Sequence, residues 1–211
     1  MRTTFIIILS LITHTLYGQE RGLDLGFNFS ILQRSNSLST ADNITFDNIT
    51  NSNRPGFDLG FSFYYVFNDR FELRTTPTMG FEEDEIIYTR RGSTEKLLFG
   101  PVFLKLPTHG IMKINKKVPL GFVLGITPNI QISQSEDARV DKLNLKRSDM
   151  SLDVGLNYPI DFPWFIFQPE IRYSKSANNS AGDNRTEYGQ GIKTFYRDKF
   201  TIGFYFRPQY D

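Results

Sequence analysis

Large apolar side chains alternate with small or polar ones over several segments of this chain of 211 residues. From Leu23 to Ile31, leucine, phenylalanine and isoleucine occupy every second position, and the positions between them carry Asp24 and small or amide residues. The same alternation returns from Phe57 to Tyr65. A period of two places the two sets of side chains on opposite faces of a β-strand. The pattern therefore predicts strands with one wholly apolar face.

Eight segments of this kind are predicted, and together they cover most of the chain. They span residues 22–31, 56–65, 71–81, 97–106, 120–132, 150–158, 165–174 and 199–206. Their length of about ten residues is what a tilted strand needs to cross a membrane. The fourth segment is the least regular, because Pro101 permits a bulge that would change its register. The sequence does not decide which of two sets of side chains faces inward. One set is Phe99 and Phe103, and the other is Leu98, Val102 and Leu104.

The connections between these segments alternate in length. Those after the first, third, fifth and seventh segments are long and polar, at residues 32–54, 83–95, 133–147 and 175–197. The connections after the second, fourth and sixth segments are shorter, at residues 68–70, 107–118 and 161–164. Outer-membrane barrels have long extracellular loops at one rim and short periplasmic turns at the other. The alternation therefore predicts both termini in the periplasm.

The face opposite the apolar one distinguishes a membrane barrel from a soluble one. A soluble β-sandwich or lipocalin-like barrel also alternates, but its outer face carries lysine, glutamate and threonine, whereas here the opposite face is mostly Gly, Ser, Asn and Thr. Small residues fit the crowded lumen of an eight-stranded barrel, and large apolar residues fit against lipid. The mean hydropathy of -0.33 argues against a helical membrane bundle. We predict an all-β, eight-stranded antiparallel transmembrane β-barrel in the outer membrane, with lipid around it.

Aromatic residues gather near the short connections, as they do at membrane interfaces. The predicted interfacial residues are Tyr65, Phe67, Trp164, Phe165 and Phe206, and Tyr64, Phe71, Phe162 and Tyr205 lie beside them in the sequence.

The first 18 residues have the features of a secretory signal peptide. Arg2 supplies a positive charge, residues 5–12 form a short apolar run, and a small polar segment ends at Gly18. The alternative, a membrane anchor, would need a longer apolar run. We predict cleavage after Gly18 and a single barrel domain from residue 19 to residue 211.

Few residues offer catalytic or ligand-binding chemistry. The chain has no cysteine and only two histidines, His14 in the predicted signal peptide and His109 in a predicted short turn at the periplasmic rim. A net charge of +1 lacks the excess of positive charge that is usual in nucleic-acid-binding proteins. The acidic run from Glu82 to Glu85 could bind a divalent cation, but a solvated loop is the more ordinary interpretation. We predict no enzymatic activity, no cofactor, no metal site and no small-molecule substrate.

The strands also carry charged residues on their predicted lumen face. These are Asp24, Asp58, Glu72, Arg74, Asp153, Glu170, Arg172 and Lys199. Side chains fill the space inside eight strands, so charges of both signs are expected to pair into a polar plug.

The carboxy-terminal half, LNLKRSDMSLDVGLNYPIDFPWFIFQPEIRYS followed by RTEYGQGIKTFYRDKFTIGFYF, resembles the PorT family of Bacteroidetes outer-membrane barrels. The likeness rests on the stretch Lys146–Asp149 that enters the sixth strand, on Gly155, and on Pro169 to Ile171. Upstream, PGFDLGFSF and FELRTTPTMGF are similar to the family's second and third strands. The departure is LLFGPVFLKLP, where Gly100 and Phe103 interrupt a stretch expected to be more uniformly aliphatic.

This resemblance implies a non-catalytic component of the type IX secretion system, which in some species also supports gliding. It further implies other secretion-system proteins as partners. The alternatives are a structural or adhesive small barrel without a secretion role and, less in keeping with the residues, a barrel enzyme acting on lipid or peptide.

Overall fold

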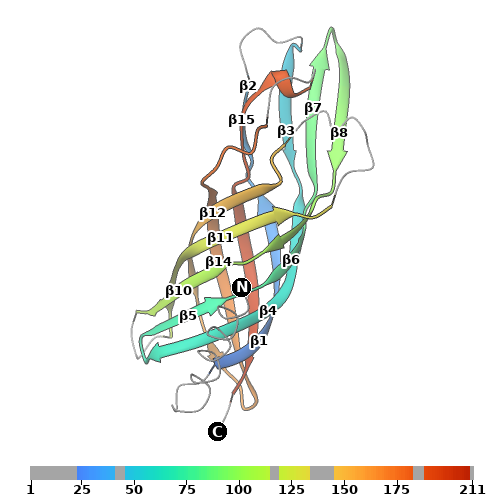
Figure 1. Ribbon diagram of the computed structural model, residues 1–211. Helices are drawn as coiled ribbons and strands as arrows, with labels where there is room; N and C mark the ends of the chain where they lie inside the picture. Colours follow the sequence, from blue (N-terminus) through green and yellow to red (C-terminus); the bar gives the residue numbers. More distant parts are fainter. Residues whose placement is uncertain (1–22, 41–45, 115–118, 134–144, 183–187, 210–211) are drawn as a thin grey trace, which may run out of the picture.

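The computed structural model describes residues 23–40, 46–114, 119–133, 145–182 and 188–209. The predicted signal peptide, with its cleavage site and His14, lies outside the described residues. Eight antiparallel strands form a closed barrel, as the sequence predicts (Figure 1). The barrel closes because β1 (Leu23–Arg34) pairs with β4 (Pro55–Asn68) on one side and with β16 (Lys199–Pro208) on the other.

Two of the eight barrel strands are each interrupted at a proline. The third consists of β5 (Phe71–Thr75) and β6 (Thr78–Phe81), and the fourth of β9 (Val102–Lys105) and β10 (Thr108–Lys113). Proline has no backbone N–H, so it cannot complete a ladder of hydrogen bonds. The remaining strands are β11 (Gly121–Gln131), β12 (Ser148–Asn157) and β14 (Phe165–Ser176), with the short β13 (Ile160–Asp161) paired to β14.

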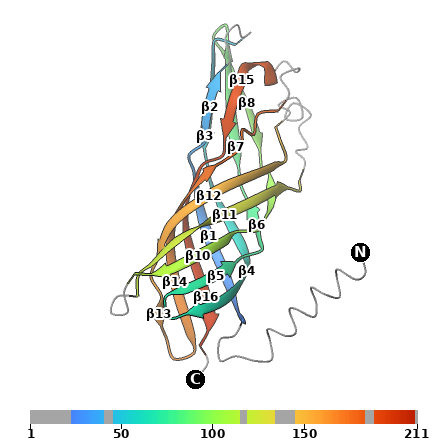
Figure 2. The ribbon, with the colours of Figure 1, turned by 60° about the vertical axis from the view of Figure 1, so that its left-hand side comes forward.

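Beyond one rim, the predicted long loops fold into two additional sheets. One contains β3 (Asn48–Asn53), β7 (Asp84–Arg90) and β8 (Ser93–Phe99), and the other pairs β2 (Ser37–Thr40) with β15 (Ile192–Tyr196), which follows the 3-10 turn Gly189–Gly191. We call these five strands the cap. Figures 1 and 2 show it as an extension of the barrel away from the short turns. The sequence predicts these segments as long polar connections, and the structure adds that they contain paired strands.

The cap has a hydrophobic core of its own, separate from the lumen. Its buried members are Phe46, Ile49, Ile86, Tyr88, Leu97, Ala181, Ile192 and Phe195. The β7–β8 turn places Arg91 at φ 50° and Gly92 at φ 77°, a backbone region that suits glycine. Because residues from the first, second and fourth long connections share one core, these connections form one packed unit.

The two faces of the barrel wall are inverted relative to a soluble protein. Apolar side chains face outward, with Phe61 60% and Leu124 59% exposed, while charged and amide side chains are buried inside. Among the described residues, no helix is long and apolar enough to cross a membrane. The outward apolar belt is the surface that lipid covers in an outer-membrane barrel.

The fourth strand differs most from the sequence prediction. Residues 97–99 belong to the cap hairpin, and the barrel strand runs on through β10 to Lys113, past Pro107. Phe103 and Lys105 point inward, whereas Leu104 and Leu106 are about half exposed on the outer face. This register settles the inward face that the sequence left open. It also places His109 inside the lumen, so its prediction as a residue of a periplasmic turn is wrong.

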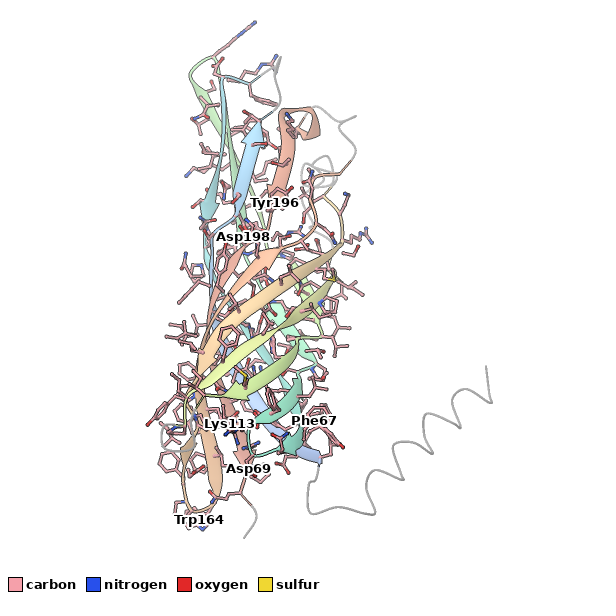
Figure 3. The ribbon with its side chains drawn as sticks, turned by 90° about the vertical axis from the view of Figure 1, so that its left-hand side faces the viewer. Phe67, Asp69, Lys113, Trp164, Tyr196 and Asp198 are labelled. Carbon is pink, nitrogen blue, oxygen red and sulfur yellow. The ribbon has the colours of Figure 1, made fainter. Side chains whose placement is uncertain are left out.

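The other rim carries the short connections. Figure 3 shows Phe67 near the end of β4, Asp69 of the β4–β5 turn, Lys113 at the end of β10, and Trp164 of the β13–β14 turn at this end. Tyr196 and Asp198 lie instead where the cap joins the barrel. The first barrel strand begins and the last ends at the short-turn rim, because Leu23 pairs with Tyr65 and Phe165 pairs with Pro208.

Candidate functional site

The lumen of the barrel is the one place where the described residues concentrate buried charge. The structure places all eight predicted lumen residues on the inner face of the wall, and seven of them are at most 5% exposed. These seven are Asp58, Glu72, Arg74, Asp153, Glu170, Arg172 and Lys199. Asp24 is the more exposed one, with a side chain that is 23% accessible.

Near the cap, the carboxylate of Glu82 is the centre of a first cluster. Its Oε1 lies 2.5 Å from Nζ of Lys105 and 3.2 Å from Nζ of Lys199, and its Oε2 accepts a hydrogen bond from Arg34. Lys105 also donates to Asp58 over 2.6 Å, and Arg34 also pairs with Asp84. A buried carboxylate is stable only when opposite charges and hydrogen bonds compensate it, and here three cations do so.

Nearer the short turns, Glu170 is the centre of a second cluster. It accepts a hydrogen bond from Arg74 over 2.6 Å and one from Arg172 over 2.8 Å, so both carboxylate oxygens are used. Arg172 also donates to the hydroxyl of Tyr205 over 3.1 Å. The guanidinium of Arg74 lies 3.7 Å from the centre of the Tyr205 ring, a favourable cation–π contact.

His109 joins the second cluster and is completely buried. Its Nδ1 lies 3.3 Å from Arg74, and its Nε2 lies 2.9 Å from Oδ2 of Asp153, which also accepts from Thr127. A guanidinium can only donate hydrogen bonds, so Nδ1 of His109 accepts one from Arg74. The ring proton is therefore on Nε2, which donates a hydrogen bond to Asp153. The neighbouring Gly125 makes room, since a Cβ there would lie 2.6 Å from the His109 ring. His109 is therefore a packed member of the network with both ring nitrogens occupied.

A third group of charges lies in the lumen at the short-turn rim. Arg207 lies 3.3 Å from Glu72 and 3.9 Å from Asp24, and its guanidinium lies 5.1 Å from the centre of the Tyr64 ring. Charge pairs thus occur at three levels of the lumen between this rim and the cap.

The acidic run from Glu82 to Glu85 is neither a solvated loop nor a grouping suited to a cation. Glu82 and Asp84 are buried against Arg34, and Glu83 and Glu85 both accept hydrogen bonds from Arg54. In the part of the chain that the structure describes, no three His, Asp or Glu side chains are grouped to hold a metal ion. The hydrogen bonds from Arg54 lower the pKa of Glu85. Both interpretations of the run offered by the sequence are therefore wrong.

The predicted interfacial aromatics lie on the outer side of the wall, near the short turns. Trp164 is 83% exposed, Phe67 51% and Phe206 36%, while Tyr65 and Phe165 are half-buried. Rings in this group contact one another, with centroids 4.8 Å apart for Tyr65 and Phe67 and 6.1 Å apart for Phe165 and Phe206.

Two further tyrosines that the sequence places beside this group, Tyr64 and Tyr205, are instead buried in the lumen, so their placement near the lipid is wrong.

Sequence reasoning missed several members of the network, although strand parity marks them. Arg34, Glu82 and Arg207 continue the inward parity of their strands just beyond the predicted ends. Lys105 and His109 are on the buried face of the fourth strand, which consists of its odd-numbered residues. Pro101 and Pro107 lie on the same face and make the alternation hard to see in the sequence.

Comparison with known proteins gives one matching family, and the similarity to one solved structure supports the barrel architecture. Residues 17–182 match the family described as "Outer membrane protein beta-barrel domain". The solved structure of the outer membrane protein OprG from Pseudomonas aeruginosa is similar, with a TM-score of 0.53, 13% identity, and coverage of 90% of this chain and 97% of that one. Neisserial surface protein A is also similar, with a TM-score of 0.44, 13% identity, and coverage of 86% of this chain and 95% of that one. No curated protein matches the chain.

Proposed function

The chain belongs to the family of outer membrane protein β-barrel domains, a family of small barrels that are typically non-enzymatic, and on this premise we propose that it acts by contact at its two rims. The observation that carries this proposal is the paired charge along the lumen. From Arg207 at one rim to Glu82 at the other, buried cations and carboxylates bind one another. With these pairs occupying the lumen, we assign contacts with other proteins to the cap and the short turns.

The proposal includes an orientation in the membrane. We place the short turns and both ends of the barrel strands in the periplasm and the cap outside the cell. Its support is the length rule for outer-membrane barrels, in which long connections lie at the extracellular rim. The cap consists of the first, second and fourth long connections.

We further propose a role in type IX secretion, as a non-catalytic component that contacts other secretion-system proteins. The support for this finer role is the sequence resemblance to the PorT family, which is strongest in β12, β14 and β16. A small structural or adhesive barrel remains the alternative.

Deleting the gene tests the secretion role. We expect export of cargo that bears the type IX signal to fall to background in the deletion strain. Complementation with the full chain should restore it, and measurement of cargo in the culture medium checks both results. Undiminished export in the deletion strain would contradict the secretion role and favour the alternative.

A further inference from the structure

A groove opens on the outer wall of the barrel where the cap begins. It has a volume of about 310 Å³. Its walls come from the start of β4, from the residues between β6 and β7, and from those between β8 and β9. Figure 1 shows this region where β6 leads toward β7. The groove lies on the outer side of the wall, and Glu82 is the one residue of the lumen charge network among those that line it.

The groove exists because a hairpin passes from the barrel into the cap at this point. Phe81 pairs with Val102 as the last pair of the barrel, and Asp84 pairs with Phe99 as the first pair of the cap. Between them the backbone N–H of Glu82 donates to the carbonyl of Pro101 over 3.2 Å. On the outer side, Gly100 is exposed and has no side chain to fill the space.

The floor of the groove is apolar. Phe57, Phe81 and Val102 are neighbours across three adjacent strands, and the rings of Phe57 and Phe81 stack with centroids 4.9 Å apart. Phe57 is 41% exposed. The floor continues directly into the outward side chains of Leu59 and Leu104, which belong to the belt that lipid covers.

The polar edge of the groove carries a pair of opposite charges. Glu83 reaches it from one side, and its carboxylate accepts a hydrogen bond from Arg54 over 3.0 Å. An edge of paired charges attracts neither an anionic nor a cationic headgroup strongly, whereas an apolar floor open to the bilayer favours hydrocarbon. The recognised part of a ligand should therefore be its acyl chain.

We propose that this groove binds one acyl chain of a membrane lipid, with the headgroup of that lipid beside the Arg54–Glu83 pair. Continuity with the lipid-covered belt is the reason for choosing a lipid as the occupant. A bound chain would cover the junction between barrel and cap, where the outward face lacks a side chain at Gly100.

Two glycines provide a matched pair of variants. Gly100 lines the groove and Gly110 lies elsewhere on the outer face, and both are exposed. A Cβ at either position would meet only one backbone oxygen, at 3.8 Å in each case. Gly100→Leu should therefore fill the groove, while Gly110→Leu adds the same side chain to the lipid-facing wall.

The experiment measures binding of dioleoyl-phosphatidylethanolamine to the full-length protein in detergent micelles by native mass spectrometry. We expect the wild type and Gly110→Leu to retain one lipid under conditions that remove the others. Gly100→Leu should bind it about tenfold more weakly, the loss expected when about two methylene groups lose their contacts. Heat-dependent electrophoretic mobility checks that each variant is folded, and Val102→Phe fills the same groove should Gly100→Leu not fold.

Soluble glycerophosphoethanolamine, which has the headgroup without acyl chains, provides the second arm. It should not displace the bound lipid. Displacement would show that the headgroup is recognised and would overturn the proposal. Equal lipid affinity of the groove-filling variant and the wild type would overturn it as well.

Discussion

Replacing Glu82 by glutamine should destabilise the folded barrel by about 3–5 kcal/mol, the usual cost of removing one partner from a buried ion pair. The substitution preserves shape but removes the charge that compensates Arg34, Lys105 and Lys199. Three buried cations would then share less negative charge in a space closed to bulk water. Urea titration of the protein in phospholipid vesicles, followed by circular dichroism, measures the change in the free energy of unfolding.

The adjacent Glu83 provides the control. Its side chain is 42% exposed and pairs with Arg54, which is 38% exposed, so Glu83→Gln should cost about 1 kcal/mol or less. Glu82 and Glu83 are adjacent in the chain, but their side chains lie on opposite faces of the wall. Equal costs for both would contradict the assignment of Glu82 to the centre of the cap-side cluster.

Placing an arginine at Ile126 should cost about 2–4 kcal/mol, because this side chain faces lipid near the middle of the barrel wall. Ile126 is 44% exposed on the outer face, and it pairs with Thr108 on one side and Leu152 on the other. A guanidinium there would have to leave water for hydrocarbon. The same urea titration in vesicles measures the effect.

Ile132 lies on the same face, just beyond the cap end of β11, and is 55% exposed. Near the membrane surface an arginine costs about 0–1 kcal/mol, so Ile132→Arg should be nearly neutral. An equal and small effect at both positions would mean that the outer face at Ile126 is in contact with water, and the proposed position of the bilayer would then be wrong.

The period-two alternation predicted the barrel because every residue of a strand faces either lipid or lumen. In β16, for example, Lys199, Thr201 and Tyr205 are buried while Phe200 and Ile202 are exposed. The same parity extends to charged residues past the predicted strand ends, such as Arg34 and Arg207. Applying it there would have found most of the network.

The fourth strand shows where local signals mislead. Pro101, Phe103, Lys105, Pro107, His109 and Ile111 all lie on the buried face. The sequence analysis ended this strand at Leu106, directly before Pro107, and interpreted Pro101 only as a position for a bulge. In the structure, the N–H of Thr76 instead donates to the carbonyl of Pro107, so the two interrupted strands break side by side. That pairing is a tertiary contact which no single segment reveals.

The cap could not be predicted from local pattern, because its segments are polar and its apolar residues are scattered. Ile49 and Ile86 come from different connections and meet only because β3 pairs with β7. Phe195 enters the same core from the last connection. Such a core depends on the barrel bringing the ends of distant strands together.

The central claim is that paired charges fill the lumen. Recording from the reconstituted protein in planar lipid bilayers tests it most directly, with a sixteen-stranded porin, which has an aqueous channel, as the positive control. The wild-type protein should show no stable openings under conditions in which the porin conducts. Stable openings of nanosiemens size would contradict a filled lumen and, with it, the proposal that this barrel acts by contact at its rims.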